Sequence, residues 1–500
     1  MAETTRWLFG DQLGPHFTRD HRGPLLLVES RAVLARRQFH RAKAHLVLSA
    51  MRHRARELGD RLTYVRTDGG YADVVRSHVG DGPVEVVHPT SYAALGLVER
   101  LGASVDLTVL DPRGFATPRE DFERWAEGRG GKRLLMEDFY RRARQAHGVL
   151  MDGAEPAGGK WNFDHENREP PPRGAASLGV PEPWWPDEDE VDEEVRADLD
   201  RWERDGHVSF IGQDAPRRFP VTRRQALAAL DHFVEHRLPH FGAHEDAVLE
   251  GDPWMAHSLV SVPLNLGLLD PLEVVERAEA AYRAGDAPIA SVEGFCRQVI
   301  GWRDYVWHLY WHFGDSYRRE NALGATERMP QWFSTLDGSA TDARCLSHTL
   351  EQVAERGWVH HIPRLMVLGS YAMQRGWSPQ QVTDWFHRAF VDGYDWVMVP
   401  NVVGMSQHAD GGAMATKPYT SGGAYLQKMT DHCGSCRFDP KVRVGEDACP
   451  FTAGYWWFLD RHRSDFAGNH RMARAVQGLD RLKDLGELVA QEDARGNRAP

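Results

Sequence analysis

Four of the five cysteines lie between positions 345 and 449, and their spacing points to metal chemistry. Cys433 and Cys436 form a Cys-x-x-Cys pair, while Cys449 directly precedes a proline and Cys345 lies far upstream. Four thiolates are enough to close a metal site. One close pair, a Cys-Pro and one remote ligand favour an iron–sulfur cluster, because zinc ribbons usually contain two close pairs. Structural zinc and reduced buried thiols are the alternatives.

The interval between these cysteines also contains two adjacent histidines. His360 and His361 follow Gly357, which ends a predicted helix. Adjacent side chains point to different sides of the chain, so one of the two rings can face a cavity. An unperturbed imidazole titrates near neutral pH, which suits a proton donor. A purely structural or exposed histidine is the alternative.

Length and composition exclude several classes of protein. The chain has 500 residues, enough for two domains, and 42% of them are hydrophobic. No apolar run is long enough to predict a membrane span. A net charge of −12 argues against non-specific coating of nucleic acid. Five cysteines and an N-terminus without the pattern of a signal peptide predict a cytoplasmic protein.

The first third of the chain predicts an α/β domain over residues 1–130. Apolar segments alternate with helical patterns, which is typical of a parallel sheet with helices on both faces. We expect strands at residues 6–10, 25–30, 62–66, 84–89 and 105–110, and a long helix at 40–58. Asp11 and Gln12 follow the first strand, at the strand end where open α/β sheets bind ligands. An ordinary Asx-turn is the alternative for this loop.

The remaining chain divides into three predicted parts. Residues 131–220 are rich in proline, glycine and charge and predict an interdomain linker, in which the acidic run 187–194 is solvated. Helical patterns dominate residues 221–485, which we expect to form an all-helical domain. Residues 486–500 predict a disordered tail.

Several sequence segments, in the same order along nearly the whole chain, carry a resemblance to a known family. They are "FGDQL", "SAMRH", "GVLMDG", "GKWNFDHENR", "EGFCRQVIGWRDY", "HHIPRLMV", "DWVMVPNVVGMSQHADGG", "ATKPY" and the four cysteine segments. The chain resembles the photolyase/cryptochrome superfamily, and within it the iron–sulfur branch of bacterial (6-4) photolyases. The resemblance implies a Rossmann-like α/β antenna domain, a long linker and an all-helical domain that binds FAD. It also implies a [4Fe–4S] cluster on the four cysteines and the antenna chromophore 6,7-dimethyl-8-ribityllumazine.

The resemblance also implies roles for individual residues. His361 is the expected proton donor to the lesion, with His360 beside it in the lesion pocket. Helix capping is the alternative role for the serine, aspartate and asparagine residues among the other candidates. The implied FAD site comprises Ser258, Ser261, Asn265, Trp385, Asp392, Asp395 and Asn401. The implied antenna site comprises Asp11 and Gln12, and the implied electron relay comprises Trp385 and Tyr425.

Four arginines are candidate contacts for DNA phosphates, although such residues more often simply solvate a surface. They are Arg217, Arg218, Arg223 and Arg224.

The chain departs from the family pattern at three places. Leu336 and Asp337 stand where many relatives have a tryptophan, and Phe386 beside Trp385 is hard to oxidise, which puts the outer relay in doubt. His88 stands where an acidic residue is common near the antenna, so lumazine binding is less secure than FAD binding.

The sequence as a whole predicts a light-driven enzyme that repairs (6-4) photoproducts in UV-damaged DNA. We expect it to act as a monomer in the cytoplasm, without a membrane partner. A cryptochrome-like photoreceptor and a photolyase for cyclobutane dimers are the nearest alternatives. An iron–sulfur radical enzyme would need a Cys-x-x-x-Cys-x-x-Cys loop, which is missing from the sequence. A non-catalytic nucleic-acid-binding protein would not need the glycine- and tryptophan-rich segment between Cys345 and Cys433.

Overall fold

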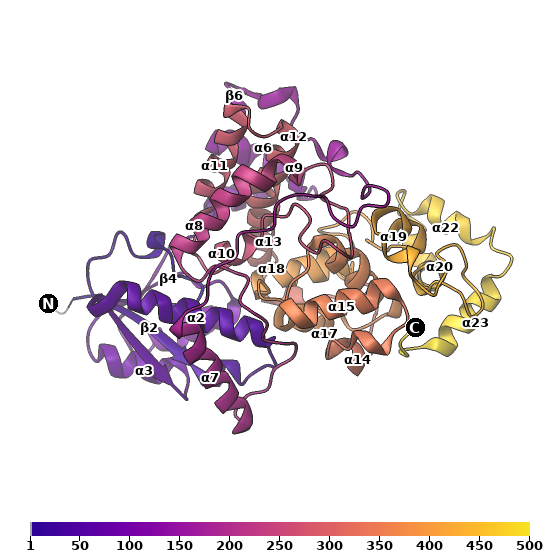
Figure 1. Cartoon of the computed structure of the whole chain (residues 1–500). Helices are drawn as coiled ribbons and strands as arrows, with labels where there is room; N and C mark the ends of the chain where they lie inside the picture. The colour runs from indigo at the N-terminus through magenta and orange to yellow at the C-terminus, as the bar shows by residue number, and fades with distance from the viewer. Residues whose placement is uncertain (1–2) are drawn as a thin grey trace.

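A five-stranded parallel sheet forms one end of the molecule (Figure 1). The computed structural model describes residues 3–500. The strands of the sheet have the order β3-β2-β1-β4-β5, as predicted for a doubly wound α/β domain. They are β1 (Thr5–Leu8), β2 (Leu25–Ser30), β3 (Leu62–Thr67), β4 (Val84–Val87) and β5 (Leu107–Leu110).

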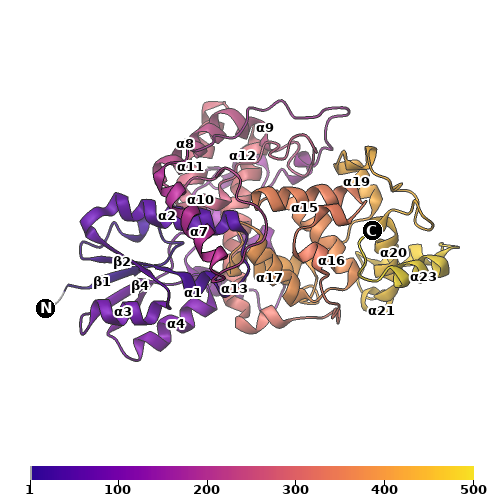
Figure 2. The ribbon, with the colours of Figure 1, turned by 60° about the horizontal axis from the view of Figure 1, so that its bottom comes forward.

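The central strands β1, β2 and β4 are mostly buried because helices cover both faces of the sheet, whereas the edge strands β3 and β5 are partly exposed. Trp7 lies in register with Leu26 and Val86, and these three side chains pack with those of helices α3 (Tyr71–Val79) and α4 (Tyr92–Gly102). Their neighbours along each strand, including Leu8 and Leu27, point to the other face. They belong to the core cluster that also contains residues of helix α2 (Arg41–Leu58). Figure 2 shows helices on both sides of the sheet.

The predicted linker, residues 131–220, contains a helix that packs on the sheet domain. Helix α7 (Glu190–Arg204) lies against α2, where Arg52 donates to Asp198 at 2.7 Å. Asp192 is buried and accepts hydrogen bonds from His45 and Arg217. The expectation that the whole acidic run is solvated is therefore wrong, because Asp192 has two buried cationic or polar partners.

The sheet domain ends earlier than residue 130. Helices α5 (Arg119–Gly128) and α6 (Met136–His147) pack on helical segments further along the chain. Phe122 stacks on His308 with ring centroids 4.6 Å apart. The carboxylate of Asp304 accepts from the backbone N–H groups of Ala116 and Thr117. Tertiary contacts thus assign α5 to the helical part, although its alternation with the strands predicted the opposite.

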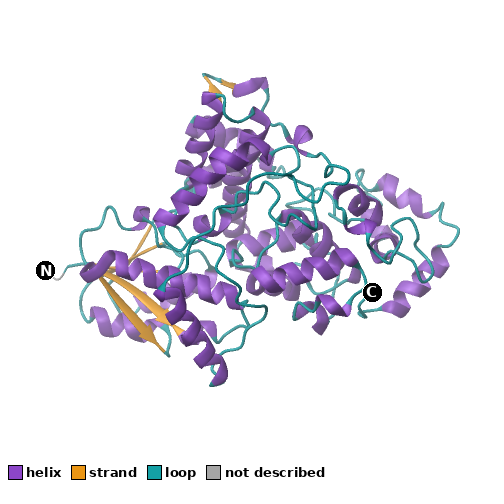
Figure 3. Cartoon of the chain, in the orientation of Figure 1, coloured by secondary structure: helices purple, strands orange, loops and turns teal. Residues whose placement is uncertain are grey.

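The rest of the described chain is almost entirely helical, as Figure 3 shows. Helix α8 begins after Thr222, whose side chain accepts from the N–H of Gln225 and caps the helix. Residues 151–156 form a short hairpin, β6 (Met151–Asp152) with β7 (Glu155–Pro156). The helices are α8 (Arg223–His232), α9 (Leu238–Phe241), α10 (Ser261–Asn265), α11 (Pro271–Ala284), α12 (Ile289–Cys296), α13 (Asp304–Phe313), α14 (Gln331–Ser334), α15 (Arg344–Arg356), α16 (Ser370–Arg375), α17 (Pro379–Ala389), α18 (Asp395–Val399), α19 (Gly423–Met429), α20 (Pro450–Arg461), α21 (Arg463–Phe466), α22 (Ala473–Leu479) and α23 (Leu485–Arg495).

Residues 486–500 are ordered, which corrects the prediction of a disordered tail. Most of this segment belongs to α23, and its Glu492 forms a buried ion pair with Arg375 at 3.1 Å. The carbonyl of Pro500 accepts from the hydroxyl of Thr341 and the N–H of Asp342. Composition alone misses this helix because its stability comes from distant partners. Within residues 3–500, the structure contains no helix with the length and hydropathy of a membrane span.

Candidate functional site

A cavity of about 990 Å³ lies within the helical part of the molecule. Three π-helical segments line it: η6 (Arg297–Arg303), η9 (Pro363–Gly369) and η10 (Pro400–Ser406). Such widened turns occur frequently at functional sites. Other lining residues come from α10, α17, α18 and α20 and from the loops around residues 245, 257, 360 and 420. A large, mostly apolar cavity with a few converging polar groups is the usual form of a cofactor or substrate site.

One wall of the cavity is organised around Asp392. The side chain of Arg364 donates two hydrogen bonds to its carboxylate, at 2.9 and 3.2 Å. Ser261 donates to the same carboxylate at 2.9 Å, and Asn265 donates to the backbone carbonyl of Asp392 at 3.1 Å. This network joins α10, η9 and the loop after α17, and it brings together three of the predicted FAD residues.

Another wall presents an ionisable pair, His361 and Asp246. The Nε2 of His361 lies 3.1 Å from Oδ1 of Asp246, and 48% of the His361 side chain is exposed. Burial opposes protonation, but the hydrogen bond and charge of Asp246 outweigh it, so the pKa of His361 is raised. The carboxylate therefore favours a protonated ring at the cavity wall.

The neighbouring imidazoles of His360 and His257 have the opposite character. His360 is only 4% exposed, and neither of its ring nitrogens has a hydrogen-bond partner. Its ring stacks on that of His257 with centroids 4.3 Å apart, and Nε2 of His257 is also unpaired. Burial, with nearby positive charge, lowers the pKa of both rings well below the ordinary value. Both rings are therefore neutral near pH 7.

Glu245, directly before Asp246, is a further titratable group at the cavity. Its side chain accepts from the amide of Gln298 at 2.7 Å. Burial raises the pKa of Glu245 to about 7, although nearby His361 and Arg297 oppose this shift. Two adjacent carboxyl groups thus have different protonation behaviour, because only Asp246 has an imidazole partner.

The other predicted cofactor residues divide into two groups. Ser258, Asn401 and Tyr425 line the cavity. Trp385 and Asp395 are not among its lining residues. The carboxylate of Asp395 instead lies 3.8 Å from both Arg37 and Arg318, on the side of α18 where these arginines meet. The structure therefore does not bring Asp395 to the cavity.

Trp385 lies one ring behind the cavity wall. Its ring contacts Phe386, which does line the cavity, at a centroid distance of 5.0 Å. On its other side, Phe333 lies 4.8 Å from Trp385 and 4.7 Å from Trp377. Half-buried Trp332 follows at 6.5 Å from Trp377. A chain of aromatic rings thus leads from the cavity toward the surface, although Leu336 and Asp337 stand where many relatives have a tryptophan.

The four cysteines of the predicted cluster converge on one region of the core. Cys345 and Cys449 are buried, and Cys433 and Cys436 pack against the same group of apolar side chains. Burial and the three neighbouring thiols raise the pKa of Cys345 well above its ordinary value. Within residues 3–500, no three of these sulfurs lie within 4.8 Å of one another. Four converging thiols are a donor set that structural zinc and an iron–sulfur cluster can both use.

Most of the side chains predicted to bind DNA or the antenna chromophore form contacts with other residues of the protein. Arg217 is buried against Asp192, which corrects the expectation that it contacts DNA. Arg223 donates to both carboxylate oxygens of Glu273. Arg218 lies over the ring of Trp185, and only Arg224 among the four is exposed.

In the sheet domain, the amide of Gln12 bonds the backbone of Phe9 and of Val87 and so holds the loop in place. Asp11 accepts from the hydroxyl of Thr90, and burial raises the pKa of Asp11. The loop therefore lies at the predicted strand end, but Gln12 already has partners for its donor and its acceptor.

Sequence reasoning missed several residues of the cavity. Asp246 and Arg364 are the partners of predicted site residues, and His257 directly precedes the predicted residue Ser258. At the cavity wall, Arg168 and Lys417 are exposed cations. The segments "HED" and "HHIPR" contain the relevant chemistry, but only the tertiary structure shows that they meet.

Comparisons with known proteins agree on one class. Residues 6–208 match the family described as "Deoxyribodipyrimidine photo-lyase-related protein". The fold is similar to a crystal structure of a class III photolyase from Agrobacterium tumefaciens, with a TM-score of 0.58 and 16% identity over 99% of this chain and 97% of that one. It is also similar to a cryptochrome from Synechocystis sp. PCC6803, with a TM-score of 0.55 and 13% identity over 81% and 83% of the two chains. These similarities show that the chain has the fold of photolyases and cryptochromes.

The sequence comparison is more specific. A "(6-4) photolyase" from Agrobacterium fabrum (strain C58 / ATCC 33970) is 38% identical over 501 residues, which cover 95% of each protein. The chain therefore belongs to the photolyase/cryptochrome superfamily and is a photolyase related to the bacterial (6-4) enzymes. As a member of this family it uses a flavin cofactor and acts on damaged DNA.

Proposed function

We propose that this photolyase splits pyrimidine (6-4) photoproducts in DNA, with His361 as the proton donor. One observation carries the proposal: the Asp392 network and the His361–Asp246 pair line the same cavity. The sequence relative named (6-4) photolyase supports the choice of lesion.

The flavin of this enzyme is FAD, and the Asp392 wall is where we propose that it binds. Ser258, Ser261, Asn265 and Asn401 supply hydroxyl and amide groups there, and Arg364 supplies the fixed positive charge that balances Asp392. Reduced flavin, when bound, supplies the electron that lesion splitting requires. The apolar side chains of Trp396 and Met398 on the cavity wall exclude water from this region.

His361 donates the proton that a (6-4) lesion needs when its hydroxyl group moves back between the two bases. Asp246 holds the imidazole by one nitrogen, which fixes the ring and stabilises its charged form. His360 is neutral and buried, so its role is to shape the pocket beside His361.

We further propose a [4Fe–4S] cluster on Cys345, Cys433, Cys436 and Cys449, with a structural role. It would join α15 to the segment before α20. Lumazine is proposed for the antenna site at the Asp11–Gln12 loop, where Asp11 supplies the acceptor, because Gln12 is engaged by the backbone. None of the five cysteines, all within residues 3–500, forms a disulfide, which suits the cytoplasm, and one chain contains the whole cavity, which supports a monomer.

The test is illumination of His361→Ala with an oligonucleotide that carries one (6-4) lesion, followed by chromatography of the products. The variant should retain FAD and lesion binding but lose repair by ~10²–10⁴-fold, the usual contribution of a general acid. His240→Ala, which removes another exposed histidine, is the control and should repair normally.

Two results would contradict the proposal. Repair by His361→Ala within a few-fold of the parent would transfer the role to His360. A parent enzyme that splits a cyclobutane dimer in a matched oligonucleotide, but leaves the (6-4) lesion intact, would show that the lesion class is wrong.

A further inference from the structure

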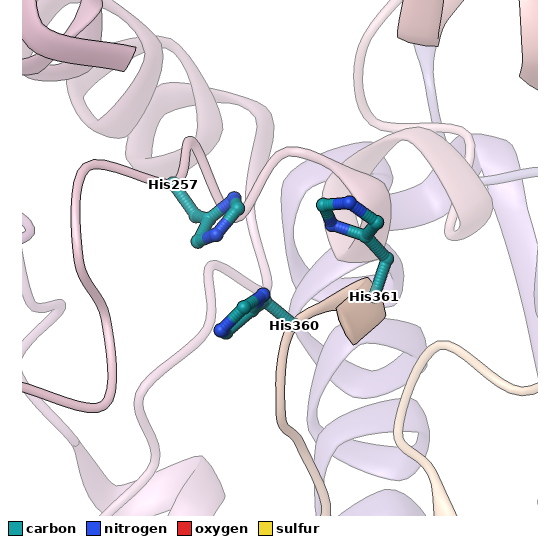
Figure 4. Close-up of side chains that lie close together, drawn as sticks. All are labelled: His257, His360 and His361. Atoms are coloured by element: carbon teal, nitrogen blue, oxygen red, sulfur yellow. The ribbon is translucent and has the colours of Figure 1, made fainter. Parts of the chain in front are cut away.

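Three imidazoles converge at the cavity wall, and Figure 4 shows them side by side. One ring nitrogen from each of His257, His360 and His361 lies within 4.8 Å of the other two. The rings come from two segments about 100 residues apart in the sequence, one before Ser258 and one before η9. Their meeting is therefore a product of the fold, not of a local sequence repeat.

The rings have free ligand nitrogens. Both nitrogens of His360 and the Nε2 of His257 are buried without a hydrogen-bond partner. Buried polar atoms in folded proteins nearly always have a partner, so such orphans point to a ligand or water. Neutral imidazole is also the form that coordinates metal ions.

The third ring has the arrangement that metal-binding histidines commonly show. His361 directs Nε2 to the carboxylate of Asp246 at 3.1 Å, which leaves Nδ1 for a ligand. A carboxylate on the far nitrogen orients a metal-bound imidazole and increases its basicity. Asp246 also supplies negative charge beside His361, which offsets the positive charge of nearby Arg364.

We propose that His257, His360 and His361 form a site for a divalent transition-metal ion of the zinc type. Three nitrogen ligands with an open fourth position, toward the cavity, match the coordination that zinc adopts outside closed structural sites. Imidazole selects zinc, copper and nickel over magnesium and calcium, which prefer oxygen ligands. Small side-chain rotations would bring nitrogens that now lie within 4.8 Å to the closer spacing of bound ligands.

Occupancy of this site would have a consequence that rests on the proposed function. The metal would hold His361 by its free nitrogen, so the ring could not give a proton to a lesion. A zinc-type ion would thus compete with the substrate for the same imidazole. The binding itself does not depend on this consequence and can be measured without DNA.

The experiment is calorimetric titration of Zn²⁺ into tag-free holoenzyme, with FAD and the cysteine site loaded, in the dark. We expect one binding site for Zn²⁺. The substitution His257→Gln should weaken the affinity of this site by at least about tenfold, because loss of a residue that only supports a metal ligand already lowers metal affinity by about 10- to 100-fold. The matched control is His236→Ala. The imidazole rings of His232 and His236, at the end of α8 and just after it, have centroids 4.7 Å apart and form another histidine pair. This variant should bind zinc at the cavity site as the parent does.

A second measurement does not depend on the folding of a variant. Sub-stoichiometric Cu²⁺ bound to the parent holoenzyme with oxidised flavin should show hyperfine coupling to three nitrogens in electron paramagnetic resonance. Absence of Zn²⁺ binding in the parent, equal affinity in His257→Gln, or coupling to fewer than three nitrogens would overturn the proposal. Because repair is not measured, a failure of the proposed function would leave this test intact.

Discussion

The environment of individual residues decides which of several similar side chains can act. His361 and His360 are adjacent in the sequence, yet Asp246 stabilises the charge of one ring while burial keeps the other neutral. Trp385 and Phe386 are adjacent too, and only the phenyl ring lines the cavity. Two predictions concern such single residues.

The first prediction is that Trp385 and Trp377 conduct electrons to the flavin. Phe386 and Phe333 are hard to oxidise, so the tryptophans are the carriers in the ring chain toward Trp332. Trp385→Phe and Trp377→Phe should each slow photoreduction, measured from the flavin absorption bands under blue light. Both variants should repair DNA normally once the flavin has been reduced chemically.

Tyr425→Phe is the comparison for this relay, because Tyr425 lines the cavity without belonging to the chain of rings. Unchanged photoreduction in both tryptophan variants, with slow photoreduction in Tyr425→Phe, would move the relay to the tyrosine.

The second prediction is that Lys417, not the arginines around position 220, contacts DNA phosphate. Lys417 is exposed at the cavity wall, whereas Arg224 is exposed on α8, which does not line the cavity. Lys417→Ala should weaken binding to lesion-containing and undamaged DNA alike. It should also reduce the slope of the logarithm of the binding constant against the logarithm of salt concentration by about 1. Arg224→Ala is the matched control, and a larger loss in that variant would contradict this assignment.

At the scale of elements, helix α7 packs on the sheet domain through buried apolar side chains and through a buried ionic network. Asp192 accepts from Arg217 at 2.8 and 2.9 Å and from His45 at 3.1 Å, and all three side chains are buried. Although burial opposes its charge, these hydrogen bonds hold the pKa of Asp192 well below its usual range. Removal of one partner from a buried ion pair costs about 3–5 kcal/mol, because the other charge stays buried.

The third prediction is therefore that Asp192→Asn destabilises the protein at pH 7 by roughly that amount. A carboxyl with a depressed folded-state pKa stabilises above its unfolded pKa of about 4 and loses this effect as pH falls further. The difference between parent and variant should thus shrink below about pH 4. Urea unfolding followed by tryptophan fluorescence at pH 7 and at low pH measures it.

Asp200→Asn is the control for α7. Asp200 belongs to the same helix, but it is exposed and pairs with Arg41 at the surface, so its loss should cost about 1 kcal/mol or less. Equal destabilisation by the two substitutions would show that the buried network does not hold the helix.

At the scale of the whole molecule, the cysteine group connects distant parts of the chain. Cys345 lies in the first turn of α15, and the other three thiols come from residues 433–449, before α20. The apolar cluster around them also contains Trp385 and Phe386, and Phe386 reaches the cavity wall. A metal cluster there would stabilise the region that positions the flavin site.

The fourth prediction is that Cys345→Ala loses flavin as well as iron and expresses poorly. Cys296→Ala is the matched control, since Cys296 is also buried but belongs to a different core cluster. Iron content, flavin absorbance and repair are measured on both purified variants. A stable, flavin-loaded and repair-active Cys345→Ala enzyme would show that no structural cluster depends on this cysteine.

The sequence by itself determined the elements and the class of this protein. Five strands follow from largely apolar runs between turn signals, and the central three are mostly buried because helices cover both faces of the sheet. The order of motifs around the cysteines and histidines identified the superfamily, which the comparisons confirm. The cluster, the antenna and the individual site roles stay predictions.

Only the tertiary structure decided which residues meet. Asp246 and His257 lie beside His361, although more than 100 residues of sequence separate them from it. Arg217, which the sequence analysis assigned to DNA, forms an ion pair with Asp192 instead. Helix α23 is ordered because Glu492 and Arg375 pair in the core. The physical reason is common to these cases. Periodicity and capping report interactions within a few residues, whereas the charge, burial and partners of a side chain depend on contacts between segments far apart in the chain.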